Sequence, residues 1–253
     1  GVKKLSLELG ASCPVIVLAD ADLELAASAV AEGGYVNAGQ VCISVQRVIT
    51  HAAIAGDFLD ALVPKVESIR TGDPSSPDTE MGTLISTREA ERVRQSIEAA
   101  AAGGAQILTG GERDGSNVAP TVVADGDPSA PIAQDELFGP AVAVSVAADW
   151  EDAISQANGT GYGLAAGIFT ADVAGTVQAI RETDAGSIHI NWTLPAYLSL
   201  MPAVAHWAAI ATRRVRSRHG RFDAMGGLAW TGAACLIINV GMMVYLLAGQ
   251  PGR

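Results

Sequence analysis

Short apolar runs alternate with amphipathic segments along most of this chain, and this alternation constrains its fold more than any other feature. Residues 14–19 form a continuous apolar run that ends at Asp20, which is typical of a strand buried in a parallel sheet. Residues 23–34 have the pattern of a helix, and residues 47–51 that of a second strand. Further helices are expected over residues 55–69, 87–102, 150–158 and 173–182, and further strands over residues 106–109, 121–124, 141–146, 165–169 and 187–190. The alternation predicts an α/β fold with a mainly parallel sheet and flanking helices.

Cys42 is the first residue whose chemistry stands out, because it follows a Gly39-Gln40 turn. A thiol becomes a strong nucleophile as a thiolate, and backbone N–H groups in such a turn favour that charge. Glu8 lies just before an apolar run, where we expect a half-buried carboxylate able to act as a general base. Cys42 and Glu8 are therefore the candidate nucleophile and base. The alternatives are a buried, inert Cys42 and a solvated Glu8.

Three short motifs follow one another at wide spacing. They are Glu8-Leu9-Gly10-Ala11 (the Glu8 box), Gly39-Gln40-Val41-Cys42 (the Cys42 box) and Glu136-Leu137-Phe138-Gly139-Pro140 (the Glu136 box). In this order they resemble the conserved boxes of the aldehyde dehydrogenase superfamily, over about residues 3–193. Ala11 departs from the family pattern, which has a second glycine there. The resemblance implies the fold of the family's catalytic domain, an α/β domain with a mainly parallel sheet.

The resemblance also implies an activity and a set of site residues. Family members oxidise an aldehyde to a carboxylic acid with NAD or NADP, through a cysteine thioester. Carried over to this chain, Cys42 attacks a small aldehyde substrate and Glu8 activates the water that hydrolyses the thioester. Glu136 and Phe138 bind the nicotinamide ribose and ring, and Asn191 forms a wall of the substrate pocket. The alternatives are a simple loop charge at Glu136 and a core residue at Phe138. No nucleic-acid partner is expected.

The family carries more than these boxes. Its dinucleotide-binding domain and an oxyanion-holding asparagine lie upstream of the Glu8 box, and neither is found in this sequence. We therefore expect residues 1–193 to be a catalytic domain without its cofactor-binding domain, an incomplete form with little or no dehydrogenase activity. An apolar face should be exposed where the second domain would pack, and this face should promote association.

Residues 194–253 differ in character from the rest of the chain. They contain six arginines and one acidic residue, whereas the whole chain has a net charge of −11. Residues 226–249 carry no charge, and 24 residues are enough to cross a hydrocarbon core of about 30 Å as a helix. Residues 194–212 are a weaker second candidate. The sequence therefore predicts a hydrophobic, basic tail with one or two membrane helices.

The tail leaves other readings open. Residues 220–223, followed by an apolar segment, faintly resemble the end of an amino-acid permease. The alternative function is therefore a membrane-tethered, non-catalytic fragment, or a fusion with a piece of a permease. We expect a cytoplasmic protein, or one anchored by its tail with the catalytic domain in the cytoplasm. The three cysteines, Cys13, Cys42 and Cys235, have no metal-binding spacing and form no even disulfide set, which favours a reducing compartment.

Overall fold

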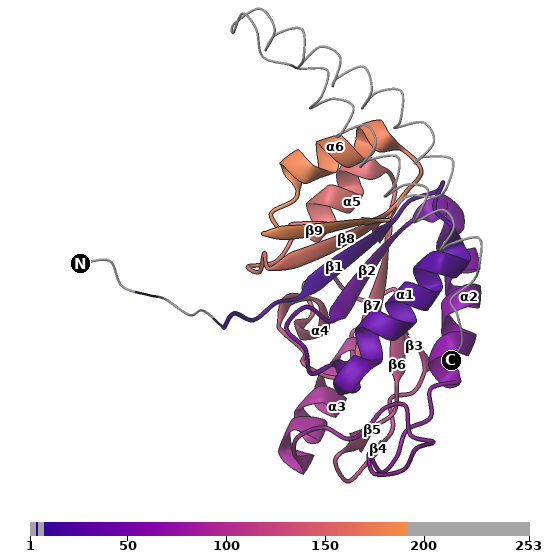
Figure 1. Ribbon diagram of the computed structural model, residues 1–253, viewed down its shortest axis with the longest axis vertical. Coiled ribbons are helices and arrows are strands. Elements are labelled where there is room, and N and C mark those ends of the chain that lie inside the picture. Colours follow the sequence, from indigo (N-terminus) through magenta and orange to yellow (C-terminus); the bar gives the residue numbers. More distant parts are fainter. Residues whose placement is uncertain (1–3, 5–7, 192–253) are drawn as a thin grey trace, which may run out of the picture. The chain divides into compact units, whose positions relative to one another are not determined.

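A seven-stranded sheet organises the computed structural model, which describes residue 4 and residues 8–191 (Figure 1). The strand order is β3-β6-β7-β2-β1-β8-β9, and only β3 runs antiparallel to its neighbour. The predicted α/β fold with a mainly parallel sheet is confirmed. The strands of this sheet are β1 (Cys13–Val17), β2 (Val45–His51), β3 (Gln106–Thr109), β6 (Thr121–Ala124), β7 (Ala141–Ala147), β8 (Ala165–Phe169) and β9 (Ser187–Asn191).

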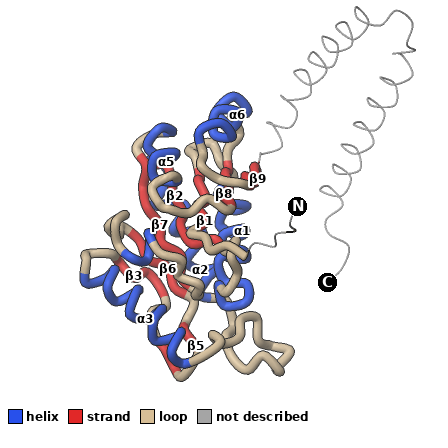
Figure 2. Tube along the Cα trace, turned by 90° about the vertical axis from the view of Figure 1, so that its left-hand side faces the viewer, coloured by secondary structure: helices blue, strands red, loops and turns tan. Residues whose placement is uncertain are grey.

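Helices cover both faces of the sheet, as the two views show (Figure 2). Side chains alternate between the faces of a strand, so Val15 and Val17 of β1 enter one core and Ile16 enters another. The first core is completed by α1, α2 and α3, and the second by α5 and α6. The helices are α1 (Leu23–Tyr35), α2 (Ala55–Glu67), α3 (Thr87–Ala102), α4 (Pro131–Gln134), α5 (Trp150–Ala157) and α6 (Val173–Glu182), with short 3-10 turns η1 (Val36–Gly39) and η2 (Ala52–Ile54).

Side-chain caps fix where several helices begin. The Asp22 carboxylate accepts a hydrogen bond from the Leu25 N–H at 3.0 Å and starts α1. Ser86 starts α3, and Asp149 starts α5, in the same way. Each cap satisfies one of the free N–H groups of a first turn, which is worth about 1 kcal/mol. These local signals explain why the predicted helix starts agree with the structure.

Two small elements differ from the predictions. The sequence analysis assigned no helix or strand to residues 110–117, but β4 (Arg113–Asp114) and β5 (Asn117–Val118) form a hairpin around Gly115, which has φ +58°. Helix α4 was not predicted either. Both are too short for a hydrophobic period to be recognised, and α4 has only four residues, beginning at Pro131.

The tail predictions cannot be compared with this structure. The membrane helix predicted over residues 226–249, the weaker candidate over residues 194–212 and the arginines between them lie outside the described residues. Within residues 8–191, every helix is too short or too polar to span a bilayer.

Candidate active site

The Glu136 box lies against the Glu8 box. The Glu136 Oε1 atom accepts a hydrogen bond of 3.0 Å from the Ala11 N–H. A Cβ atom on Gly10 would lie 2.6 Å from Glu136 Oε2, so the glycine is what allows the carboxylate to come this close. Ala11 is itself buried, with 4% exposure. The structure thus joins two motifs that are more than a hundred residues apart in the sequence.

The Glu136 box also contacts the Cys42 box. A Cβ atom on Gly39 would lie 2.1 Å from the Gly139 carbonyl oxygen, and Gly39 has φ +69°. The two residues before it, Asn37 and Ala38, are also left-handed, with φ of 52° and 55°. The Gln40 side chain donates to the Asn37 carbonyl at 3.0 Å, and the Asn37 side chain donates to the Gln40 carbonyl at 3.1 Å. Such strained backbone is held only where its surroundings enforce it, and it is common at functional sites.

Cys42 lies in the turn that leads into β2. This turn is closed by a 3.0 Å hydrogen bond from the Ser44 N–H to the Val41 carbonyl, and Cys42 is half-buried. The Cys13 thiol donates to the Cys42 carbonyl oxygen, with 3.6 Å between sulfur and oxygen. Burial raises the pKa of Cys13 to about 11, so Cys13 remains a thiol at neutral pH. Cys42 is therefore the more accessible of the two cysteines that the structure describes.

Glu8 and Phe138 are both more exposed than their neighbours. Glu8 is solvent-exposed, so the half-burial that we expected for its carboxylate is wrong. Phe138 is 41% exposed and has φ +49°, an unusual conformation for a bulky residue, whereas the preceding Leu137 is buried. The alternative that Phe138 is a core residue is therefore wrong. The Glu136 box presents a carboxylate and an aromatic ring at the surface.

Asn191 lies further along the sheet. Asn191 pairs with Phe169, which in turn pairs with Val17 of β1. Val17 lies four residues beyond Cys13, so Asn191 is offset from Cys13 by about 13 Å along the strands. A cavity of about 170 Å³ with a largely apolar wall extends between Cys13 and Asn191. Cys13, Ile43, His189 and Asn191 line it together with residues of α1, β1, β2 and β8. The structure thus places Asn191 on a cavity next to the Cys42 turn, not beside Glu136.

Gln46 is a site residue that our sequence analysis missed. Cys13 pairs with Val45 and Pro14 pairs with Arg47, so Gln46 is an extra residue in the ladder. Its side chain is buried against residues 132–137, the segment around Glu136. The amide oxygen accepts from the Leu137 N–H at 2.8 Å, and the amide nitrogen donates to the Asp135 and Ile132 carbonyls at 2.6 and 3.1 Å. Gln46 therefore fixes the peptide groups on both sides of Glu136.

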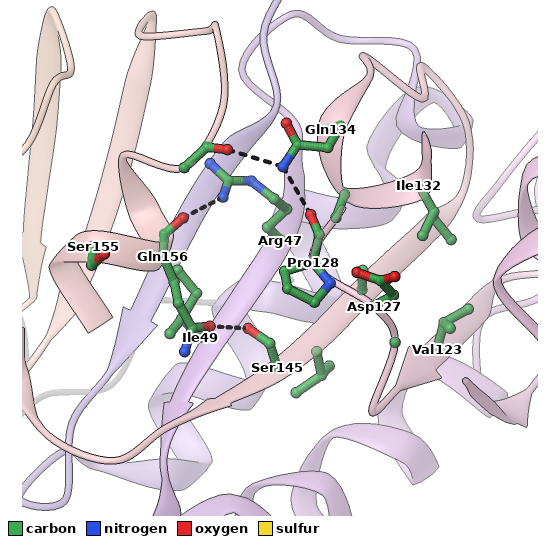
Figure 3. Close-up of a pocket in the computed structure, with 15 residues that line it drawn as sticks. Arg47, Ile49, Val123, Asp127, Pro128, Ile132, Gln134, Ser145, Ser155 and Gln156 are labelled. Carbon is green, nitrogen blue, oxygen red and sulfur yellow. Dashed lines mark hydrogen bonds between the residues drawn. The ribbon is translucent and has the colours of Figure 1, made fainter. Parts of the chain in front are cut away.

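Arg47, the next residue of β2, connects this strand to Ser12 and to the end of α5 (Figure 3). Its guanidinium group donates to the carbonyls of Ser12 at 3.1 Å, Gln156 at 2.8 Å and Ala157 at 2.8 Å, and the residue is 7% exposed. Burial lowers the pKa of Arg47 to about 10. Two of its acceptors belong to the last turn of α5, where free carbonyls carry partial negative charge. A polar pair inside an apolar strand was the available signal for Gln46 and Arg47, since buried polar groups need partners.

Comparisons with known proteins agree with the three boxes. Residues 1–203 match the model of the aldehyde dehydrogenase family, a range that includes residues 194–203 of the segment that we assigned to the tail. Among curated proteins, a 3-sulfolactaldehyde dehydrogenase of Priestia aryabhattai is 41% identical over 191 residues, which cover 76% of this chain and 40% of the relative. The chain thus spans about two fifths of the length of this relative.

Solved structures give the same result. An NAD-dependent aldehyde dehydrogenase from Sinorhizobium meliloti superposes with a TM-score of 0.72 at 38% identity, covering 76% of this chain and 39% of that one. An NADP-dependent glyceraldehyde-3-phosphate dehydrogenase from Bacillus halodurans C-125, complexed with NADP, superposes with a TM-score of 0.71 at 33% identity, covering 74% and 39%.

Proposed function

The chain belongs to the aldehyde dehydrogenase family, and on this basis we propose that Cys42 is the nucleophile of an aldehyde-oxidising site. The observation that carries the proposal is the contact of the Glu136 box with both of the other boxes. The Ala11 N–H contacts the Glu136 carboxylate, and Gly39 lies against Gly139. Motifs that are far apart in the sequence and meet at one place are typical of a catalytic centre.

Each residue has a distinct part in the proposed reaction. The Cys42 thiolate attacks the aldehyde carbonyl carbon and forms a carbon–sulfur bond. Loss of hydride from that carbon leaves a thioester on Cys42. Glu8 takes a proton from water, the water attacks the thioester carbon, and the carbon–sulfur bond breaks to release the carboxylic acid. The exposure of Glu8 leaves it accessible to water. A small aldehyde is the substrate class, as the names of the relatives suggest.

Glu136 and Phe138 fit one side of a nicotinamide nucleotide. The Glu136 Oε1 atom is held by the Ala11 N–H, which leaves Oε2 to accept from a ribose hydroxyl group. Phe138 is 41% exposed and lies two residues after Glu136, so we expect its ring to offer an aromatic face to the nicotinamide. NAD or NADP, when bound, supplies the acceptor for the hydride. Gln46 keeps the loop that carries both groups in place.

We expect the 253-residue polypeptide by itself to be a weak esterase and not a dehydrogenase. The chain corresponds to about 40% of the length of its relative, so Glu136 and Phe138 are expected to bind the nucleotide from one side only. Attack on an activated ester needs only a positioned thiolate and a base. The family's oxyanion asparagine lies upstream of the Glu8 box, and a polypeptide of these 253 residues, tested without that donor, is expected to react about 10²- to 10³-fold more slowly. Hydrolysis of p-nitrophenyl acetate and the formation of NADH or NADPH should be measured side by side.

The variants test each role separately. Cys42→Ala is expected to abolish ester hydrolysis, and Glu8→Gln to slow it by on the order of 10²-fold. Glu32→Gln is the matched control, because Glu32 is also an exposed glutamate but lies on α1. It should leave the rate unchanged. Ester hydrolysis that survives in Cys42→Ala would refute the assignment of the nucleophile, and robust NADH formation from an aldehyde would refute the one-sided cofactor site.

We further propose that the tail anchors the protein to a membrane, on the basis of the uncharged stretch at residues 226–249. With this single span, residues 1–193 and the arginines that precede the span lie in the cytoplasm. We expect the chain to sediment with membranes and to resist extraction at alkaline pH, while the variant that ends at residue 193 does not sediment with them. Recovery of the full chain in the soluble fraction would exclude the anchor.

A further inference from the structure

Cys13 and Cys42 come together although they are 29 positions apart in the sequence. Cys13 is the first residue of β1, and its sulfur lies 3.6 Å from the Cys42 carbonyl oxygen. A carbonyl oxygen lies about 2.4 Å from its own Cα atom, so the Cys13 sulfur is within about 6 Å of the Cys42 Cα. This distance is short enough for the two thiols to be joined after a local movement.

The surrounding backbone permits this movement. Cys42 lies in a turn outside β2, where no ladder hydrogen bond restrains it. Cys13 lies at the beginning of β1, next to the irregular pairing at Gln46. Disulfide formation requires the two Cα atoms to come within about 4.4 to 6.8 Å. A turn and a strand end can adjust by an ångström or two without disturbing the centre of the sheet.

We propose that Cys13 is a resolving thiol that forms a reversible disulfide with Cys42 when peroxide oxidises the site. The Cys42 thiolate attacks one oxygen of hydrogen peroxide, the O–O bond breaks, and Cys42 becomes a sulfenic acid as hydroxide leaves. The Cys13 sulfur then attacks the Cys42 sulfur. The S–OH bond breaks, and the Cys13 proton leaves with the hydroxyl group as water. Two electrons pass from the two thiols to the peroxide.

The different environments of the two thiols set the order of these events. Cys42 is half-buried and is reached first by the oxidant, whereas Cys13 is 4% exposed and is held as a thiol. The disulfide would remove the nucleophile of the proposed reaction, but it would also stop oxidation at a stage that thiols can reverse. The inference rests on the proposed function only in taking Cys42 as a reactive thiolate.

The test uses the full chain with Cys235→Ser, so that Cys13 and Cys42 are the remaining cysteines. After treatment with hydrogen peroxide, we expect an intact mass lower by about 2 Da, a peptide that links Cys13 to Cys42, and full recovery of both thiols with dithiothreitol. In the Cys13→Ser variant of this protein, Cys42 should instead gain about 32 Da as a sulfinic acid, which dithiothreitol does not reverse.

The parent protein alone decides the question even if the Cys13→Ser variant does not fold. A sulfinic acid on Cys42 of the parent, or a disulfide only between two chains, would overturn the proposal. Ester hydrolysis distinguishes it from the proposed function. A chain that forms the disulfide but hydrolyses no ester supports the resolving thiol and not the enzyme, while the opposite result supports the enzyme and not the resolving thiol.

Discussion

Replacing Gly39 by alanine is expected to destabilise the protein by about 3 to 4 kcal/mol, from two separate costs. The first is the left-handed backbone at φ +69°, which costs a residue with a Cβ atom about 1 to 2 kcal/mol. The second is a contact of 2.1 Å between the new Cβ and the Gly139 carbonyl oxygen. Backbone cannot rotate away as a side chain can, so the Glu136 box has to move. Denaturant unfolding would measure the loss of stability.

Gly115→Ala is the matched control for this variant. Gly115 has a similar φ of +58°, but a Cβ atom there would meet nothing within 4 Å. It therefore carries the backbone cost alone, about 1 kcal/mol. The difference of about 2 to 3 kcal/mol between the variants reports the packing of the two boxes. Equal effects of Gly39→Ala and Gly115→Ala would show that the boxes are not in contact in solution.

Arg47→Met should have an effect of similar size, about 3 kcal/mol. Methionine replaces the aliphatic stem of arginine but has no side-chain donor, so the carbonyls of Ser12, Gln156 and Ala157 all lose the guanidinium group. Hydrogen bonds to a charged group contribute about 1.5 to 3 kcal/mol each, and removing the buried charge returns part of that sum. Thermal or urea unfolding of the purified variant would measure the effect.

Arg70→Met provides the comparison at the surface. Arg70 pairs with Glu80 at 3.4 Å, and its side chain is 62% exposed. Exposed pairs of this kind contribute about 0 to 1 kcal/mol. A loss of stability in Arg47→Met no greater than that in Arg70→Met would mean that water replaces the lost contacts, and that Arg47 does not fasten β1 to α5.

The sequence predicts the large elements of this fold well because their signals are local. Asp22 caps α1, and the apolar run before Asp20 becomes β1, so the boundaries of both elements are determined by residues only a few positions away. The hairpin has a local turn signal in Gly115-Ser116 that our sequence analysis did not use, whereas the four-residue helix α4 has no comparable signal. Their formation depends on contacts with α3, which lies far from α4 in the sequence.

The candidate site divides in the same way. Its motifs can be recognised from the sequence, but their surroundings depend on the tertiary structure. The exposure of Glu8 depends on which other parts of the protein pack against it, and the residues around Glu8 in the sequence do not reveal this. Gln46 was missed because its role comes from an irregular pairing of β1 with β2 that directs its amide to Leu137 and Asp135. Asn191 is placed by the register of β9, which the sequence leaves open.

The central position of β1 also has a consequence for how the protein is made. This strand leaves the ribosome before the other strands of the described sheet, yet one of its two neighbours, β8, begins at Ala165. The Asp20 carboxylate likewise has no partner until Thr170, which donates a hydrogen bond to it at 2.9 Å, has been synthesised. At about 5 to 20 residues per second, synthesis leaves one edge of an apolar strand unpaired for roughly 8 to 30 seconds. An open edge of this kind is a template for association with other chains, so the nascent polypeptide is at greater risk of aggregation than the finished sheet.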